Sequence, residues 1–106
     1  MVNLNQFREL DLCVATVLKA ESIVNSQNLL KLTIDLGTEQ RQIVAGIANF
    51  YKPEQLIGRQ IAVVANLEPK SFLGILSQGM LLAAENDGDL SLLTLDKEMP
   101  PGSKIY

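Results

Sequence analysis

The 106 residues, 47% of them hydrophobic, are enough for one domain with a single core. A formal net charge of −3 argues against loose binding to bulk RNA or to anionic membranes, and favours at most a small, shaped basic patch. One cysteine and no histidine exclude an internal disulfide, a zinc site and a histidine-assisted nucleophile.

The first half of the chain predicts a short helix and two strands. Asn3 and Gln6 have capping-box spacing, and we expect the helix they begin to plug one end of a barrel. From Leu12 to Leu18 apolar residues fall on both faces, as in a strand buried on both sides. From Leu30 to Leu36 apolar and polar residues alternate, which indicates one core face and one wet face, and Gly37-Thr38 makes the next turn.

The second half predicts further strands, joined by turns. Their expected ranges are Arg41 to Ile47, Ile61 to Asn66, Gly79 to Ala84 and Leu90 to Leu95. Gly46 indicates a bulge or a close backbone approach. Pro53 to Leu56 fits one helical turn that Gly58 ends, and Asn86 to Asp89 fits a hairpin turn. Pro100 to Tyr106 stops the last strand and adds a short extended piece.

Four short motifs stand out: Val44-Ala45-Gly46-Ile47, Ala65-Asn66-Leu67, Ser77-Gln78-Gly79-Met80 and Pro100-Pro101-Gly102. They resemble the stand-alone tRNA-binding domain family, which also forms the C-terminus or beta chain of methionyl-tRNA synthetases. The resemblance runs from about Phe7 to Tyr106, nearly the whole chain.

Periodicity predicts only a small all-β barrel, and the resemblance implies the rest of the fold. A short helix between the third and fourth strands is the order of the OB-fold, a five-stranded Greek-key barrel. We therefore expect residues 1–106 to form a single tRNA-binding-type OB domain with short helices and a C-terminal extension.

The resemblance also implies a tRNA-binding surface on the second and third strands and on the loops 23–28 and 67–76. The residues predicted to contact tRNA are Asn28, Lys31, Arg41, Asn66, Lys70, Ser77, Gln78 and Met80. Ser77 and Gln78 would hydrogen-bond nucleotide edges, and Met80 would touch a base face. All of these residues except Gln78 have a structural alternative. Asn28 fits a polar turn, Asn66 can satisfy loop backbone and Met80 fits the core. Ser77 fits a bulge, and the basic residues fit a solvated surface.

Departures from the family pattern remove positive charge. Many members are basic where this chain has Cys13, Asn28, Ser71 and Leu73. Because each lost phosphate contact weakens binding, tRNA would be bound weakly or with help from a partner. The few aromatic residues are too scattered to stack several bases, so shape recognition of folded RNA fits better than single-strand binding.

These observations predict a non-catalytic tRNA-binding module without a cofactor or metal, acting in trans or as an appended domain of methionyl-tRNA synthetase. A mechanism with paired carboxylates stays formally possible, although most acidic residues fall at predicted turns. The expected partners are tRNA, a second copy joined through Phe7, Leu10 and Ile105-Tyr106, and a synthetase catalytic chain; DNA is not expected. The alternative is a dimeric protein-binding or export-chaperone-like OB module that uses the apolar loop at Phe72, Leu73 and Ile75. A weaker option is a structural subunit of a larger synthetase complex.

The cellular location is predicted by default, from the lack of membrane and secretion signals. No apolar segment approaches the roughly 20 residues that a membrane-spanning helix needs. Met1 to Asn5 lacks the basic and then apolar pattern of a secretion signal. We expect a cytoplasmic protein with no membrane partner.

Overall fold

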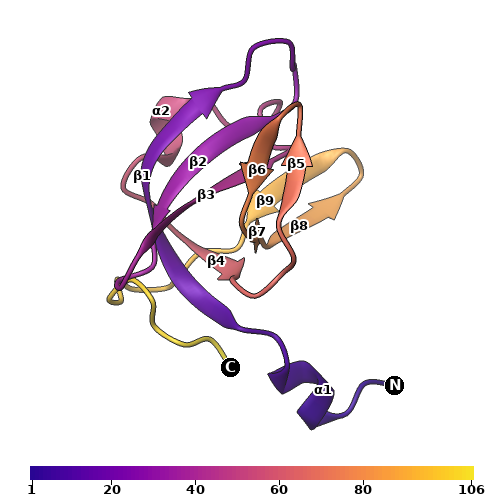
Figure 1. The fold of residues 1–106 in the computed structure, drawn as a ribbon, viewed down its shortest axis with the longest axis vertical. Helices are drawn as coiled ribbons and strands as arrows, with labels where there is room; N and C mark the ends of the chain where they lie inside the picture. The colour runs from indigo at the N-terminus through magenta and orange to yellow at the C-terminus, as the bar shows by residue number, and fades with distance from the viewer.

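Antiparallel strands form a curled sheet in the computed structural model, which describes residues 1–106 (Figure 1). The sheet has five strands in the order β3-β2-β1-β4-β7. Their bounds are β1 Leu12–Ser22, β2 Leu30–Asp35, β3 Gln40–Ala45, β4 Gln60–Val64 and β7 Met80–Leu81. In β2 buried and half-buried residues alternate, which confirms the predicted core and wet faces.

The long strand β1 is bent and pairs with two other strands along different parts of its length. Its residues 12–16 pair with β4 and its residues 16–22 with β2, and the register with β2 shifts between Val17 and Lys19. A bulge of this kind bends the strand and increases its twist. The predicted bulge at Gly46 is wrong, since the β2–β3 register is regular up to Ala45. Nor is Gly46 a close approach, because a Cβ there would meet only the Asn28 carbonyl oxygen, at 3.9 Å.

The barrel closes between β3 and the segment that joins β6 (Ile75–Ser77) to β7. The Gln78 N–H donates to the Gln42 carbonyl at 2.9 Å. The Ser77 Oγ accepts a hydrogen bond from the Val44 N–H at 2.9 Å and donates to the Gly79 carbonyl at 3.1 Å. This nearly closed five-stranded antiparallel barrel confirms the predicted all-β OB-fold.

A glycine is required at this closure. Gly79 has a φ of +130°, and a Cβ there would lie 2.8 Å from the Val64 carbonyl oxygen of the neighbouring strand. Any larger residue would therefore push β7 away from β4.

The helices differ in what they bury. α2 (Pro53–Leu56) begins with Pro53 as predicted and places Leu56 fully inside the core. α1 (Leu4–Arg8) has the predicted capping box between Asn3 and Gln6 but buries no residue. The expectation that the first helix plugs the barrel is wrong, because its apolar side chains lie outside the barrel, at the end where both termini are found (Figure 1). Neither helix is long and apolar enough to cross a membrane.

The chain after β4 departs most from prediction. The expected loop at residues 67–76 contains a hairpin of β5 (Lys70–Phe72) and β6. The expected strand from Gly79 to Ala84 is split into β7 and β8 (Ala83–Asn86), and β8 forms the predicted hairpin with β9 (Asp89–Leu92). The split follows from pairing, because β7 pairs with β4 whereas β8 pairs only with β9.

The C-terminal segment adds the predicted extended piece along β1. The Val14 N–H donates to the Ser103 carbonyl at 2.9 Å, the Gly102 N–H donates to the Val14 carbonyl at 2.7 Å, and Cys13 bridges Lys104. This segment continues the row of β2 beside the part of β1 that β2 does not reach.

Candidate nucleic-acid interface

An open hollow lies between the β5–β6 hairpin and the start of β7. Its volume is about 380 Å³, and we call it the Phe72 hollow. Its lining residues are Leu67, Glu68, Lys70, Phe72, Ser77, Gly79 and Met80. The structure thus brings three predicted contacts, Lys70, Ser77 and Met80, to one place.

Lys70 is the free cation of this hollow. Its side chain is exposed, and its Nζ lies 5.2 Å from the centroid of the Phe72 ring, within cation–π range. Lys70 takes part in none of the four salt bridges of the chain. Its ammonium is therefore available to an anion such as a phosphate.

Met80 and Ser77 differ in exposure. Met80 is half-buried, so part of its flexible apolar side chain faces the hollow. Ser77 is only 3% exposed, and the two hydrogen bonds of its hydroxyl close the barrel. The structure therefore gives Ser77 a role in holding the wall of the hollow rather than a free hydroxyl for a ligand.

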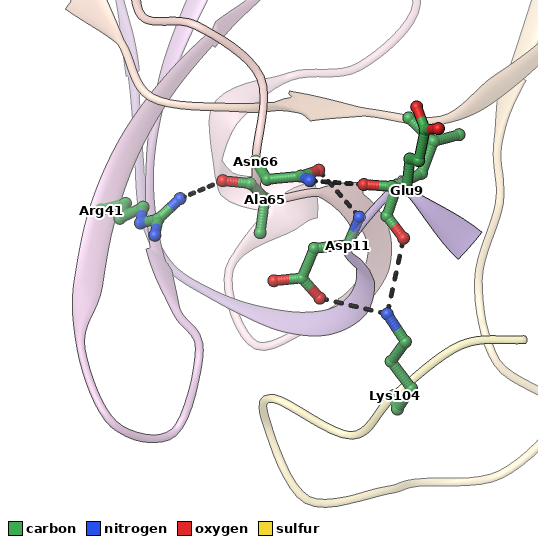
Figure 2. A network of polar contacts seen from close by, with 7 residues as sticks. Glu9, Asp11, Arg41, Ala65, Asn66 and Lys104 are labelled. Carbon is green, nitrogen blue, oxygen red and sulfur yellow. Dashed lines mark hydrogen bonds and ion pairs between the residues drawn. The ribbon is translucent and has the colours of Figure 1, made fainter. Parts of the chain in front are cut away.

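Arg41 and Asn66 lie near the hollow, because Asn66 directly precedes its lining residue Leu67 and Arg41 bonds the Ala65 carbonyl, and both bind backbone (Figure 2). The Arg41 guanidinium donates to the Glu39 carboxylate and to the Ala65 carbonyl. The Asn66 amide accepts a hydrogen bond from the Asp11 N–H at 2.8 Å and donates to the Glu9 carbonyl at 2.7 Å. Asn66 thus ties the end of β4 to the link between α1 and β1, which confirms its alternative role as a partner of loop backbone.

The remaining predicted contacts are Asn28 and Lys31, near the β1–β2 loop, and Gln78, at the barrel closure. Asn28 is exposed, and its Oδ1 accepts from the Ser26 hydroxyl at 3.1 Å. The Lys31 Nζ lies 3.9 Å from the Glu21 carboxylate, which also pairs with Lys19 at 3.3 Å. Gln78 is half-buried beside the closure. No concentrated basic patch results, because Glu21 partly neutralises the lysines near the loop.

Three side chains of the Phe72 hollow, Leu67, Glu68 and Phe72, were not among the predicted tRNA contacts. Phe72 is one of the few aromatic residues, and Glu68 is one of the acidic residues near a strand end. Recognising β5 as a strand would have found Phe72, because residues 70 and 72 share one face of a strand. Glu68 gives no local signal, since an acid after a strand end is usually just solvated.

Cys13 is a core side chain. It is buried, and burial together with the nearby Asp11 carboxylate raises the pKa of its thiol, so the thiol is neutral at ordinary pH. No group of three or more histidine, cysteine or acidic side chains is placed to hold a metal ion.

The fold and the Phe72 hollow define a class: a small OB-type binding domain with an open hollow beside the β5–β6 hairpin. A family model described as "Putative tRNA binding domain" matches residues 12–104, and the chain belongs to this family.

Two curated relatives support this family assignment. The chain is 56% identical over 104 residues to the methionine–tRNA ligase of Thermotoga maritima, covering 98% of this chain and 16% of the ligase. It is 57% identical over 105 residues to that of Methanothrix thermoacetophila, covering 99% of this chain and 16% of the ligase. The chain therefore spans about 16% of the length of these relatives. It is homologous to a tRNA-binding-type domain of methionyl-tRNA synthetase, which confirms the resemblance read from the motifs.

Solved structures share the whole fold. A MetRS-related protein from Pyrococcus horikoshii superposes with a TM-score of 0.95 at 39% identity, covering 100% of this chain and 98% of that one. Chaperone CsaA from Bacillus anthracis superposes with a TM-score of 0.90 at 37% identity, covering 100% and 99% of the two chains.

Proposed function

We propose that this domain binds folded tRNA without catalysing a reaction, either in trans or as an appended domain of a methionyl-tRNA synthetase in the cytoplasm. The observation that carries the proposal is the Phe72 hollow, with an unpaired Lys70 beside an aromatic ring, in a chain of the tRNA-binding domain family. The homology to methionine–tRNA ligases supports the class of RNA.

Some of the proposed contacts to tRNA are charged and the others are uncharged. Lys70 binds a phosphate, while Asn28 and Gln78 offer uncharged donors and acceptors to sugars and base edges. Lys31 adds a weaker positive contribution because it shares Glu21 with Lys19. Arg41, Asn66 and Ser77 hold these contacts in place through their bonds to backbone.

So few free cations give weak binding, which tethering can compensate. A domain joined to a synthetase, covalently or by docking on its catalytic chain, meets the tRNA at a high effective concentration. Its contribution is then a raised affinity for tRNA rather than a chemical step.

A homodimer would also strengthen binding, since two barrels can contact one tRNA. The supporting surface is the terminal face, defined by Leu4, Phe7, Leu10, Ile105 and Tyr106. These residues line a hollow of about 400 Å³, in which Leu4 is 59% and Tyr106 95% exposed. An isologous contact would cover these side chains.

Sedimentation should show a dimer that Phe7→Ser dissociates. Val24→Ser changes an exposed apolar residue elsewhere and should leave the dimer intact. A wild-type monomer at all concentrations would contradict the dimer alone.

A second candidate function is protein binding. Val24 is 83% exposed and Leu73 is 61% exposed; Leu73 lies at the hairpin tip and both residues line one hollow. Exposed apolar side chains of this kind suit an unfolded or extended polypeptide, and the likeness to chaperone CsaA favours the same reading.

One titration separates the two functions. Labelled tRNA is titrated with the protein at low and moderate salt, with unstructured RNA of equal length as control, and anisotropy is measured. We expect tighter binding to tRNA, weakened by salt and by Lys70→Glu but not by Leu73→Ser. No binding at low salt would overturn the tRNA proposal. Peptide binding that is lost in Leu73→Ser and kept in Lys70→Glu would then support the second function.

A further inference from the structure

We propose that the Phe72 hollow takes up one unpaired base of the bound RNA and selects guanine through Glu68. This inference rests on the proposed binding of tRNA and names the nucleotide that the same site reads.

The size and walls of the hollow suit a single base. Its volume of about 380 Å³ is near the lower end of the range for small-ligand sites, which begins at about 300 Å³. Phe72 and Met80 are half-buried, so each presents part of an apolar surface, and Leu67 adds a third wall. An aromatic ring stacks with any base, and a thioether adapts to its edge. With one aromatic residue in the lining, the hollow holds one base.

The charges in the hollow point to base reading by Glu68. A carboxylate repels the RNA backbone, so an acid within such an interface weakens binding unless it faces a base edge. Glu68 forms none of the four salt bridges of the chain, although Lys70 lines the same hollow. Both oxygens of its carboxylate are acceptors.

Guanine is the base that matches two neighbouring acceptors. Its Watson–Crick edge places the N1–H and the N2 amino group side by side, so a carboxylate can accept both bonds with the strength of charge assistance. Adenine and cytosine each present one amino group beside a ring nitrogen acceptor. Uracil presents one N–H between two carbonyl oxygens. A carboxylate facing these three bases meets at least one acceptor that repels it.

Lys70 completes the site without reading sequence. Its ammonium rests over the Phe72 ring with no carboxylate partner, so it can move to the phosphate next to the inserted base. Glu68 then sets the preference for guanine, and Lys70 sets the affinity for every sequence.

The test is an NMR titration of the full chain with pentanucleotides that differ only at the centre: UUGUU, UUIUU, UUAUU, UUCUU and UUUUU. Inosine lacks the N2 amino group and isolates one of the two bonds. We expect shifts of Phe72 and Met80 signals with UUGUU, and an affinity about tenfold lower with each other centre, the factor that the loss of one charge-assisted bond gives.

Substitutions test whether Glu68 is the residue that gives the preference for guanine. Glu68→Gln should remove the preference for guanine over inosine, whereas Glu85→Gln, an exposed acid on β8, should keep it. Lys70→Gln should weaken all pentanucleotides alike. Equal binding of all centres, a preference that survives Glu68→Gln, or no shifts in the hollow would overturn the inference. Because tRNA anisotropy is measured separately, tRNA binding without guanine preference overturns this inference only, and loss of tRNA binding overturns the proposed function.

Discussion

Two neighbouring groups of polar side chains near the end of β4 are used differently. In the first group, Asn66 and Arg41 bind carbonyls or N–H groups of the backbone, and Lys104 pairs with Asp11 at 3.3 Å (Figure 2). In the second group, Lys70 and Glu68 face one hollow and form no salt bridge. A polar group already bonded within the chain stabilises the fold, whereas one without a partner is free for a ligand. Substitutions should therefore separate stability from binding according to the group in which they are made.

The largest effect is expected at the barrel closure. Gly79→Ala combines a positive φ with a Cβ at 2.8 Å from the Val64 carbonyl oxygen, so we expect a loss of about 3 kcal/mol in the free energy of unfolding. Gly88→Ala is the matched control, because Gly88 also has a positive φ but has nothing within 4 Å of a Cβ. Urea denaturation measures both, and equal losses would show that closure does not depend on this close approach.

Ser77→Ala should have the next largest effect. Removing the hydroxyl leaves the buried Val44 N–H without a partner, which costs about 2 kcal/mol. Ser91→Ala, at an exposed position on β9, should change stability little. If Ser77→Ala instead kept its stability and lost tRNA affinity, Ser77 would belong with the contact residues of the hollow.

Asn66→Ala should cost less, because its partners are exposed to water. We expect a loss of about 1 kcal/mol, with unchanged tRNA affinity for the folded variant. Asn49, an exposed asparagine in the loop after β3, provides the control as Asn49→Ala. A large fall in tRNA affinity with Asn66→Ala, at normal stability, would break the distinction between the two groups.

Lys70→Gln should have the smallest effect on stability. An exposed lysine without an ion pair contributes less than about 0.5 kcal/mol to folding. Its tRNA affinity should fall, and the slope of log affinity against log salt should decrease by about one. Lys97→Gln, another exposed lysine, serves as control. An unchanged slope would mean that Lys70 does not contact a phosphate.

Much of the barrel could be predicted from the sequence because apolar alternation decides it. β1 to β4 bury their apolar residues with the exception of Leu18, and each confirmed turn or cap has its own local signal. The β5–β6 hairpin has no such signal, since its turn places Leu73 at a φ of +51°, a conformation that leucine rarely adopts. The break between β7 and β8 depends on which strand each one meets, and this is a tertiary property.

The candidate site could be predicted only in part for a related reason. The expected loop 67–76 located Lys70, the Ser77-Gln78-Gly79-Met80 motif located Met80, and both residues do line the hollow. The sequence pattern could not tell that Asn66, Arg41 and Ser77 are already bonded, because each has a backbone partner at least 24 residues away along the chain. Glu68 was missed because its lack of an ion pair becomes visible only once its neighbours are placed.

The Ser77 hydroxyl links the hollow to the integrity of the barrel. Between β3 and β7, the Ser77 side chain forms a hydrogen bond at a position where backbone amides would otherwise form a continuous ladder. Such a seam is a natural place for local opening, which amide hydrogen exchange at Val44 would report. Since the same serine lines the hollow, an occupant that requires the closed wall must suppress this opening. Binding would then slow exchange along the seam and raise the melting temperature in proportion to the logarithm of ligand concentration.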